Sequence, residues 1–137
     1  MNNQYYEKIS ALYPYSNGKS FYNIDVNTHV NFINIPVRVG LFNIIPNNEY
    51  KLLFSIDYTN NIPIHSAMFD INISNNFIDD NNTTTMDGDF FIQGILLPKD
   101  KKDKDTVKIS ATLLPAKPFN GSSMPSKAET FVQLNIN

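Results

Sequence analysis

The chain has 137 residues, the size of one ordinary domain, and its 42% hydrophobic content is enough to form one buried core. Eleven basic and thirteen acidic residues leave a net charge of −2, which provides no general attraction toward nucleic acid or anionic lipid. The absence of cysteine excludes disulfides, thiolate nucleophiles and cysteine-based metal sites. We therefore expect a single soluble domain with neither nucleic acid nor membrane as its partner.

The N-terminal segment is richer in tyrosine than the remainder of the chain. We assign residues 1–20 to a Tyr-rich arm that packs on a domain spanning residues 21–137. Within the arm, the apolar side chains of residues 1–12 have roughly helical spacing, which indicates a short N-terminal helix that would need packing to be stable.

The beginning of the chain does not have the pattern of an export signal, in which a basic stretch precedes an apolar one. The most apolar stretch, residues 32–45, is interrupted by polar residues and proline before it reaches the length of a membrane helix. By default we expect a cytoplasmic location, with a virion component as the alternative.

The next two segments contain many β-branched and aromatic residues, which favour strands. Phe21–Val26 is one of them and Val30–Ile45 is the other. Proline has no backbone N–H to donate within a sheet. We therefore expect the second segment to be divided into two strands near Pro36 or Gly40.

Three further segments alternate apolar and polar residues with the period of a half-buried strand. They are Glu49–Tyr58, Thr106–Leu114 and Ala128–Ile136. The inward side chains of the first are expected to be Tyr50, Leu52, Phe54, Ile56 and Tyr58.

Two segments depart from simple alternation. In Ile62–Ile73 the apolar side chains change parity near Ser66, which indicates a bulge or a strand that crosses between sheets. Asp89–Leu97 is apolar on both sides, a pattern typical of a central strand that is covered on both faces. Gly94 within it indicates a bulge or a bend.

Turn-forming residues separate most of these segments. They are Asn17-Gly18, Pro46-Asn47-Asn48, Asn60-Asn61, Asp87-Gly88 and Asn120-Gly121. The result is about seven or eight strands with no helical pattern between them. We predict an all-β fold, an antiparallel two-sheet β-sandwich, for which immunoglobulin-like and jelly-roll topologies both remain open.

His29 and His65 are the side chains whose ordinary pKa lies near neutrality, so they are the first candidates for acid–base chemistry. Neither lies in a recognisable motif, and no serine lies in a nucleophile elbow. We assign no catalytic residue, no metal ligand and no cofactor. An enzyme, or a domain that binds a small ligand or carbohydrate through His29 or His65 with carboxylates such as Asp57 or Asp70, is kept as one alternative.

Tyrosine is the residue type whose distribution points to a binding role. Five of the seven tyrosines occur within the first 22 residues: Tyr5, Tyr6, Tyr13, Tyr15 and Tyr22. Tyrosine combines a large contact area with a polar group and is enriched in recognition surfaces. We therefore predict partner contacts there, although the same rings would also serve to dock the arm onto the sandwich.

These observations favour a non-catalytic binding or accessory module. Its partner would be another protein or a second copy of the chain, contacted through an exposed strand edge or the Tyr-rich arm. A phage structural or host-attachment component is a further alternative of the same fold class.

Overall fold

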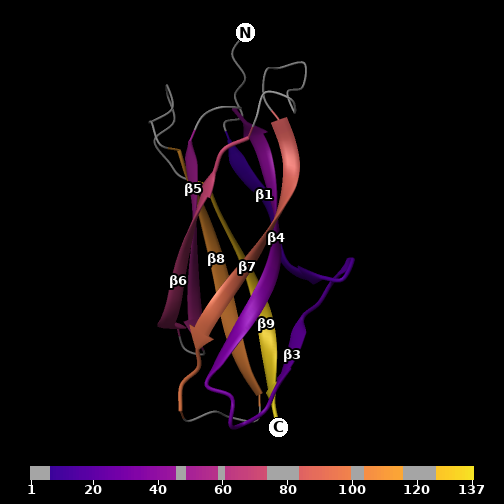
Figure 1. Ribbon diagram of the computed structural model, residues 1–137, viewed down its shortest axis with the longest axis vertical. Helices are drawn as coiled ribbons and strands as arrows, with labels where there is room; N and C mark the ends of the chain where they lie inside the picture. The colour runs from indigo at the N-terminus through magenta and orange to yellow at the C-terminus, as the bar shows by residue number, and fades with distance from the viewer. Residues whose placement is uncertain (1–6, 46–48, 59–60, 74–83, 100–103, 116–125) are drawn as a thin grey trace.

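The structure is a computed structural model that describes residues 7–45, 49–58, 61–73, 84–99, 104–115 and 126–137. This part of the chain contains nine strands and no helix (Figure 1). The strands are β1 (Lys8–Ser16), β2 (Lys19–Ser20), β3 (Asn23–Val26), β4 (Phe32–Ile44), β5 (Tyr50–Tyr58), β6 (Ile62–Ile71), β7 (Thr84–Leu96), β8 (Lys104–Pro115) and β9 (Ser126–Ile136).

The strands form two sheets that pack face to face in an elongated sandwich (Figure 1). One sheet has the order β2-β1-β4-β7 and the other the order β3-β9-β8-β5-β6. All pairs are antiparallel except β3 with β9. The predicted two-sheet sandwich is confirmed. The orders β1-β4-β7 and β9-β8-β5-β6 correspond to strands A-B-E and G-F-C-C′ of an immunoglobulin-like sandwich, so this topology fits and the jelly roll does not.

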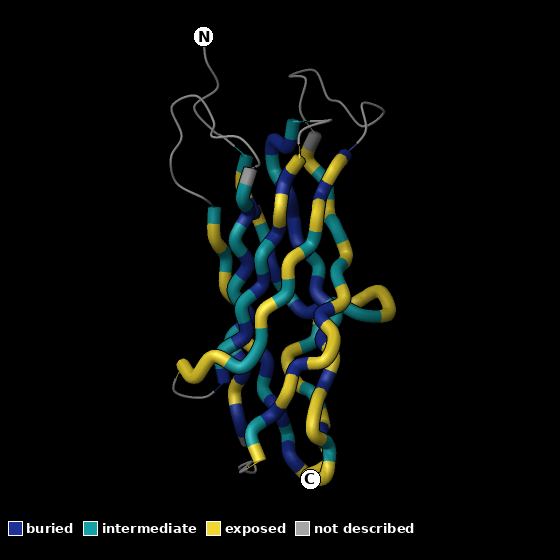
Figure 2. Tube along the Cα trace, turned by 60° about the vertical axis from the view of Figure 1, so that its left-hand side comes forward, coloured by how far each residue is buried: buried dark blue, intermediate teal, exposed yellow. Residues whose placement is uncertain are grey.

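Alternating burial along the strands builds the core, as the dark blue and yellow segments of Figure 2 show. In β5 all five side chains expected to face inward are buried. Strands β8 and β9 repeat the pattern, and their buried apolar residues are Val107, Ile109, Ala111, Leu113, Val132, Leu134 and Ile136. Because successive side chains of a strand point to opposite faces, the sequence period alone places these residues correctly.

Three phenylalanine rings connect the two sheets on the side where β6 and β7 lie. Phe54 of β5 is fully buried, and its ring centroid lies 5.7 Å from those of both Phe69 in β6 and Phe90 in β7. The rings of Phe69 and Phe90 are 5.3 Å apart. This cluster is the aromatic contact between the sheets on that side, where edge-to-face ring packing adds to the burial of apolar area.

In β6 the predicted change in which alternate side chains face inward is confirmed, and a β-bulge causes it. Ile56 pairs with His65, whereas the next residue, Asp57, pairs with Pro63. Ile64 is therefore the extra residue, and a single insertion transfers the following side chains to the opposite face.

The Asn17-Gly18 turn is also confirmed, as the two-residue connection of the β1–β2 hairpin. Both residues have positive φ angles, 54° and 82°, which the tightest hairpin turns require and which Asn and Gly tolerate best. The predicted turns at 46–48 and 120–121, and Asn60, lie outside the described residues.

The helix expected within residues 1–12 is wrong where the structure describes the chain, because Lys8–Ser16 is strand β1. Ile9 and Leu12 are both buried although they are three residues apart. A register shift between Ile9 and Ala11 explains this spacing, because the bulge at Ser10 imitates a helical period. The division of the chain at residue 20 stays a prediction.

Two expected interruptions are also wrong. Strand β4 continues through Pro36 and Gly40. Pro36 lies beyond the last residue paired with β1, so its missing N–H leaves no partner on β1 unsatisfied. Gly40 leaves room for the bulge, since a Cβ there would lie 2.6 Å from Ser10 Oγ. Asp87-Gly88 is not a turn, because both residues pair with β4 in the middle of β7.

The expected central position of the segment 89–97 is wrong as well. Among the described strands β7 pairs with β4 alone and therefore lies at the edge of its sheet. No described element covers the outer face of this strand, and Phe91 and Leu96 are exposed there.

We predict that Phe54→Ala will lower the free energy of unfolding by about 3–5 kcal/mol, because it opens a cavity between the sheets. Urea denaturation measures this change. Phe131→Ala is the control, because Phe131 is 54% exposed, and it should change stability by no more than about 0.5 kcal/mol. Similar losses in the two variants would contradict the role of the ring cluster.

Candidate functional site

Two of the five tyrosines predicted as partner contacts lie together on the outer face of the four-stranded sheet. Tyr13 and Tyr15 project from β1 on the side opposite buried Leu12 and Pro14, with ring centroids 5.9 Å apart in an edge-to-face arrangement. The Tyr22 side chain is exposed but does not belong to this pair of rings. Its backbone carbonyl accepts a hydrogen bond from the backbone N–H of Gln133 in β9. Tyr5 and Tyr6 lie outside the described residues.

Arg38 connects this pair of rings to the neighbouring strands. Its guanidinium carbon lies 3.7 Å from the centroid of the Tyr15 ring, which is a cation–π contact. The same guanidinium donates two hydrogen bonds to Asp89, from Nε to Oδ1 at 2.7 Å and from an NH2 nitrogen to Oδ2 at 3.0 Å. In the sheet, Tyr13 pairs with Arg38 and Arg38 with Asp89, so the contacts follow one row across β1, β4 and β7.

The ion pair favours the charged form of both Arg38 and Asp89. The two hydrogen bonds from Arg38 lower the pKa of the Asp89 carboxyl, and they raise the pKa of the guanidinium in turn. The row therefore presents a neutralised Arg–Asp pair with aromatic rings beside it.

Apolar side chains continue this surface along the strands. Pro36 of β4 pairs with Phe91 of β7, and Phe91 is 47% exposed. Further along, Phe32 pairs with Leu96, and both are more than half exposed. We call the surface of Tyr13, Tyr15, Pro36, Arg38, Asp89 and Phe91 the aromatic face.

The outer face of the five-stranded sheet is different in character. Lys108 lies 3.5 Å from Asp57 and 3.6 Å from Glu129, and serines and threonines occupy neighbouring positions. Met68 and Phe131 are its exposed apolar residues within the described strands. A charged, hydroxyl-rich sheet face of this kind is well solvated, whereas the aromatic face exposes apolar area of the kind that marks interaction sites.

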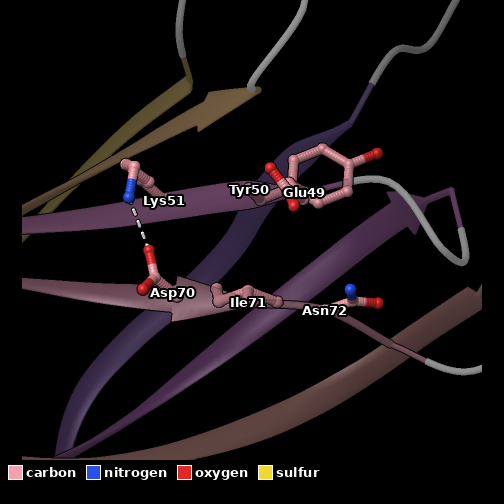
Figure 3. Close-up of a pocket in the computed structure, with 6 residues that line it drawn as sticks. All are labelled: Glu49, Tyr50, Lys51, Asp70, Ile71 and Asn72. Atoms are coloured by element: carbon pink, nitrogen blue, oxygen red, sulfur yellow. Dashed lines mark hydrogen bonds and ion pairs between the residues drawn. The ribbon is translucent and has the colours of Figure 1, made fainter.

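A shallow pocket of about 270 Å³ lies at the ends of β5 and β6 (Figure 3). Its lining residues are Glu49, Tyr50, Lys51, Asp70, Ile71 and Asn72. Lys51 donates to Asp70 Oδ1 at 2.6 Å, and both side chains are more than half exposed. Exposed pairs of this kind contribute little energy, and the pocket contains no nucleophile beside a base.

The structure does not bring the two histidines together. His29 is exposed in the turn between β3 and β4, where its backbone N–H donates to Asn27 Oδ1 at 2.9 Å. His65 is half-buried in β6, at the opposite edge of the sheet from β3. Within the described ranges, no group of three or more His, Asp or Glu residues is arranged to hold a metal ion.

A buried polar pair lies elsewhere in the sandwich. The hydroxyl of Tyr58 donates to Asp105 Oδ2, and both residues are less than 10% exposed. Burial raises the pKa of Tyr58, and the hydrogen bond and charge of Asp105 raise it further. Because the pair connects β5 to β8, we assign it a role in stabilising the sheet.

Tyr13 and Tyr15 were predicted as partner contacts from the sequence, and that role stays a prediction. Arg38 and Asp89, which lie beside them in the structure, were not predicted. Arg38 is the single arginine of the chain and lies at an outward position of an otherwise apolar strand. A single charged residue in an otherwise apolar strand was the feature of the sequence that could have indicated Arg38. Its partner could not be found in the same way, because Asp89 is 51 residues distant in sequence.

Neither a protein-family model nor a curated protein matches this sequence. Among solved structures, the fold is similar to a bacterial adhesin from Mobiluncus mulieris, with a TM-score of 0.54 and 10% sequence identity. The match covers 82% of this chain and 53% of the adhesin chain, so the protein spans about half of its length. At this identity the likeness shows the fold.

That adhesin contains intramolecular disulfide, isopeptide and ester cross-links. A disulfide cannot form in the present chain, which has no cysteine. Separately, no helix in the part of the chain that the structure describes is long and apolar enough to span a membrane.

We predict that Arg38→Gln will return the pKa of Asp89 to its ordinary value of about 3.9, because the charged donor is lost. NMR titration of the Asp89 carboxyl carbon measures this. Because the folded-state pKa is lowered, the pair stabilises the protein above about pH 4 and its contribution is lost as the pH falls through that pKa. Lys51→Gln is the control. An unchanged Asp89 titration in the Arg38 variant would contradict the assignment.

We predict that Tyr58→Phe will destabilise the protein by about 1–3 kcal/mol at neutral pH, because the buried Asp105 carboxylate loses a donor. With its pKa raised in the folded state, Tyr58 stays protonated there above about pH 10, while the unfolded chain ionises. The difference between wild type and variant should therefore shrink above that pH. Urea unfolding at both pH values tests this, and a difference that does not depend on pH would refute it.

Proposed function

We propose that the protein is a non-catalytic binding module that contacts another protein through its aromatic face. The observation that carries this proposal is the difference between the two outer faces. One is polar and charged, whereas the other presents tyrosine, proline and phenylalanine around a stacked arginine.

The composition of the aromatic face suits a protein partner. Aromatic residues and arginine are enriched at protein interfaces and dominate their binding energy. The Arg38–Asp89 pair and the T-shaped tyrosines hold one another in place before a partner arrives, which lowers the entropy lost on binding. The face also lies on strands of a packed sheet, which position side chains more rigidly than loops do.

A role in attachment to a surface is the form of this proposal that the adhesin-like fold favours, although one fold supports many functions. A phage host-attachment component would use the same face and stays a prediction. The cytoplasmic location, the lack of nucleic-acid or membrane partners and the use of His29 or His65 by an enzyme also remain hypotheses. None of them is needed for the binding proposal.

The wild type and the double variant Tyr13→Ser/Tyr15→Ser are each immobilised and exposed to an extract of cells that express the gene. The proteins captured by the two are then compared. We expect at least one protein whose capture falls about tenfold or more in the variant, since losing a buried aromatic anchor costs about 2 kcal/mol or more. Quantitative mass spectrometry measures the amounts.

Phe131→Ser is the matched control, because it removes an exposed ring from the opposite face. It should retain the same proteins as the wild type. Thermal unfolding verifies that all three chains are folded. Captured proteins that respond equally to the two changes, or to neither, would contradict a specific role of the aromatic face.

A further inference from the structure

Strand β7 is apolar on both of its sides and lies at the edge of its sheet. On its inner side Ile92 and Ile95 are fully buried, and on its outer side Phe91 and Leu96 are apolar and exposed. Among the described strands β7 pairs with β4 alone, so its other edge faces no strand of this part of the chain.

The other edges of the two sheets are short or interrupted, whereas β7 is the longest edge strand of the two sheets. Strand β2 has two residues and β3 has four. Strand β6 contains Pro63 and the bulge at Ile64. By contrast, β7 contains no Pro, Lys or Arg, and it pairs with β4 without interruption from Met86 to Ile92. A regular edge of this length is a template for another strand. Asp87, Asp89 and the register shift near Gly94 restrict the registers in which a second strand can pair with it.

We propose that β7 pairs antiparallel with β7 of a second copy of this chain across a two-fold axis. The two four-stranded sheets then become one sheet of eight strands. The same surface serves both copies, as a closed two-fold dimer requires. In the dimer β7 has a neighbouring strand on each side.

The charges on the outer side of β7 select one register. Pairing centred on Gly88 or Asp89 would place Asp87 or Asp89 directly opposite an aspartate of the second copy, which is unfavourable. Pairing centred on Phe91 would extend only two residues to Gln93 before it reached the register shift near Gly94, where φ is 70°. Pairing centred on Phe90 avoids both problems.

In this register Asp89 lies opposite Phe91 of the second copy, and Gly88 lies opposite its Ile92. The half-buried Phe90, which packs against Phe54 and Phe69, gains a covering strand. The two aromatic faces then lie side by side on one surface. Only about five residues of each copy pair, so the interface is at the small end of the known range and should depend on concentration.

This proposal goes beyond the proposed function, although its register uses Asp89 and Phe91 at one border of the aromatic face. Tyr13 and Tyr15 lie on β1, two strands away from the β7 edge. A chain that fails to dimerise could still capture a partner through them, and a dimer could form without capturing one.

The absence of cysteine allows a register-specific cross-linking test. Chains carrying Asp89→Cys are mixed with chains carrying Phe91→Cys under mild oxidation. In the proposed register the two new thiols are directly opposite, with Cβ atoms about 4.5–5.5 Å apart, whereas thiols at identical positions are diagonal and about 7–8 Å apart. We expect the disulfide between unlike chains to exceed both disulfides between like chains at least fivefold, as measured by intact mass.

The control mixture carries Glu129→Cys and Phe131→Cys, which have the same two-residue spacing on the outer face of β9. It should give the products of random collision, in which unlike and like pairs form in statistical proportion. The same statistical proportion in the β7 mixture would overturn the proposed register.

A second measurement needs no substitution at β7. Sedimentation equilibrium of the wild type should show a species of twice the 15.6 kDa chain mass that increases with protein concentration. A chain that stays monomeric up to about 0.5 mM, where even an affinity near −4.5 kcal/mol would show, would overturn the proposal.

Discussion

The alternation of side chains along β4 is the constraint on which the remaining structure depends. Its inward residues, among them Ile35, Val37 and Val39, are almost completely buried against the opposite sheet. Their burial forces the residues between them outward, and Arg38 is one of these. A shift of one residue in the register would exchange the two sets and place a guanidinium in the core, where an unpaired charge is very costly. The packing of the core therefore also determines the composition of the outer surface.

The aromatic face is a consequence of this constraint. Once Arg38 points outward between β1 and β7, the sheet register places Tyr13 on one side of it and Asp89 on the other. The carboxylate holds the guanidinium at two points, and the Tyr15 ring covers it. Side chains held in place in this way would lose little conformational entropy if a partner bound to them.

Much of the fold could be predicted from the sequence, and the errors have identifiable causes. Strands β5, β8 and β9 keep a strict period of two, so their inward residues were predictable. The bulge at Ser10 hid β1, because one extra residue placed Ile9 and Leu12 at a spacing that also fits a helix. The bulge at Ile64 was predictable, since the apolar residues of that strand extend on both sides of it.

The position of β7 and the composition of the site could not be read from local patterns. An apolar pattern on both sides of a strand usually indicates that both faces are covered. The outer face of β7 departs from this rule, because Phe91 and Leu96 are exposed there. The tyrosines of β1 were predictable because they cluster in sequence. Arg38 and Asp89 become neighbours only through the sheet, so their pairing depends on strand order, which local sequence does not encode.

The central claim is that this molecule binds a protein through the outer side of one sheet. The most direct measurement is NMR cross-saturation from an unlabelled captured partner to the deuterated, nitrogen-labelled protein. The account predicts that signal loss will be confined to the outward residues of β1, β4 and β7, with Tyr15 and Arg38 at its centre. Signal loss centred on Lys108 and Phe131 of the opposite sheet, or on the loops at the ends of the sandwich, would contradict it.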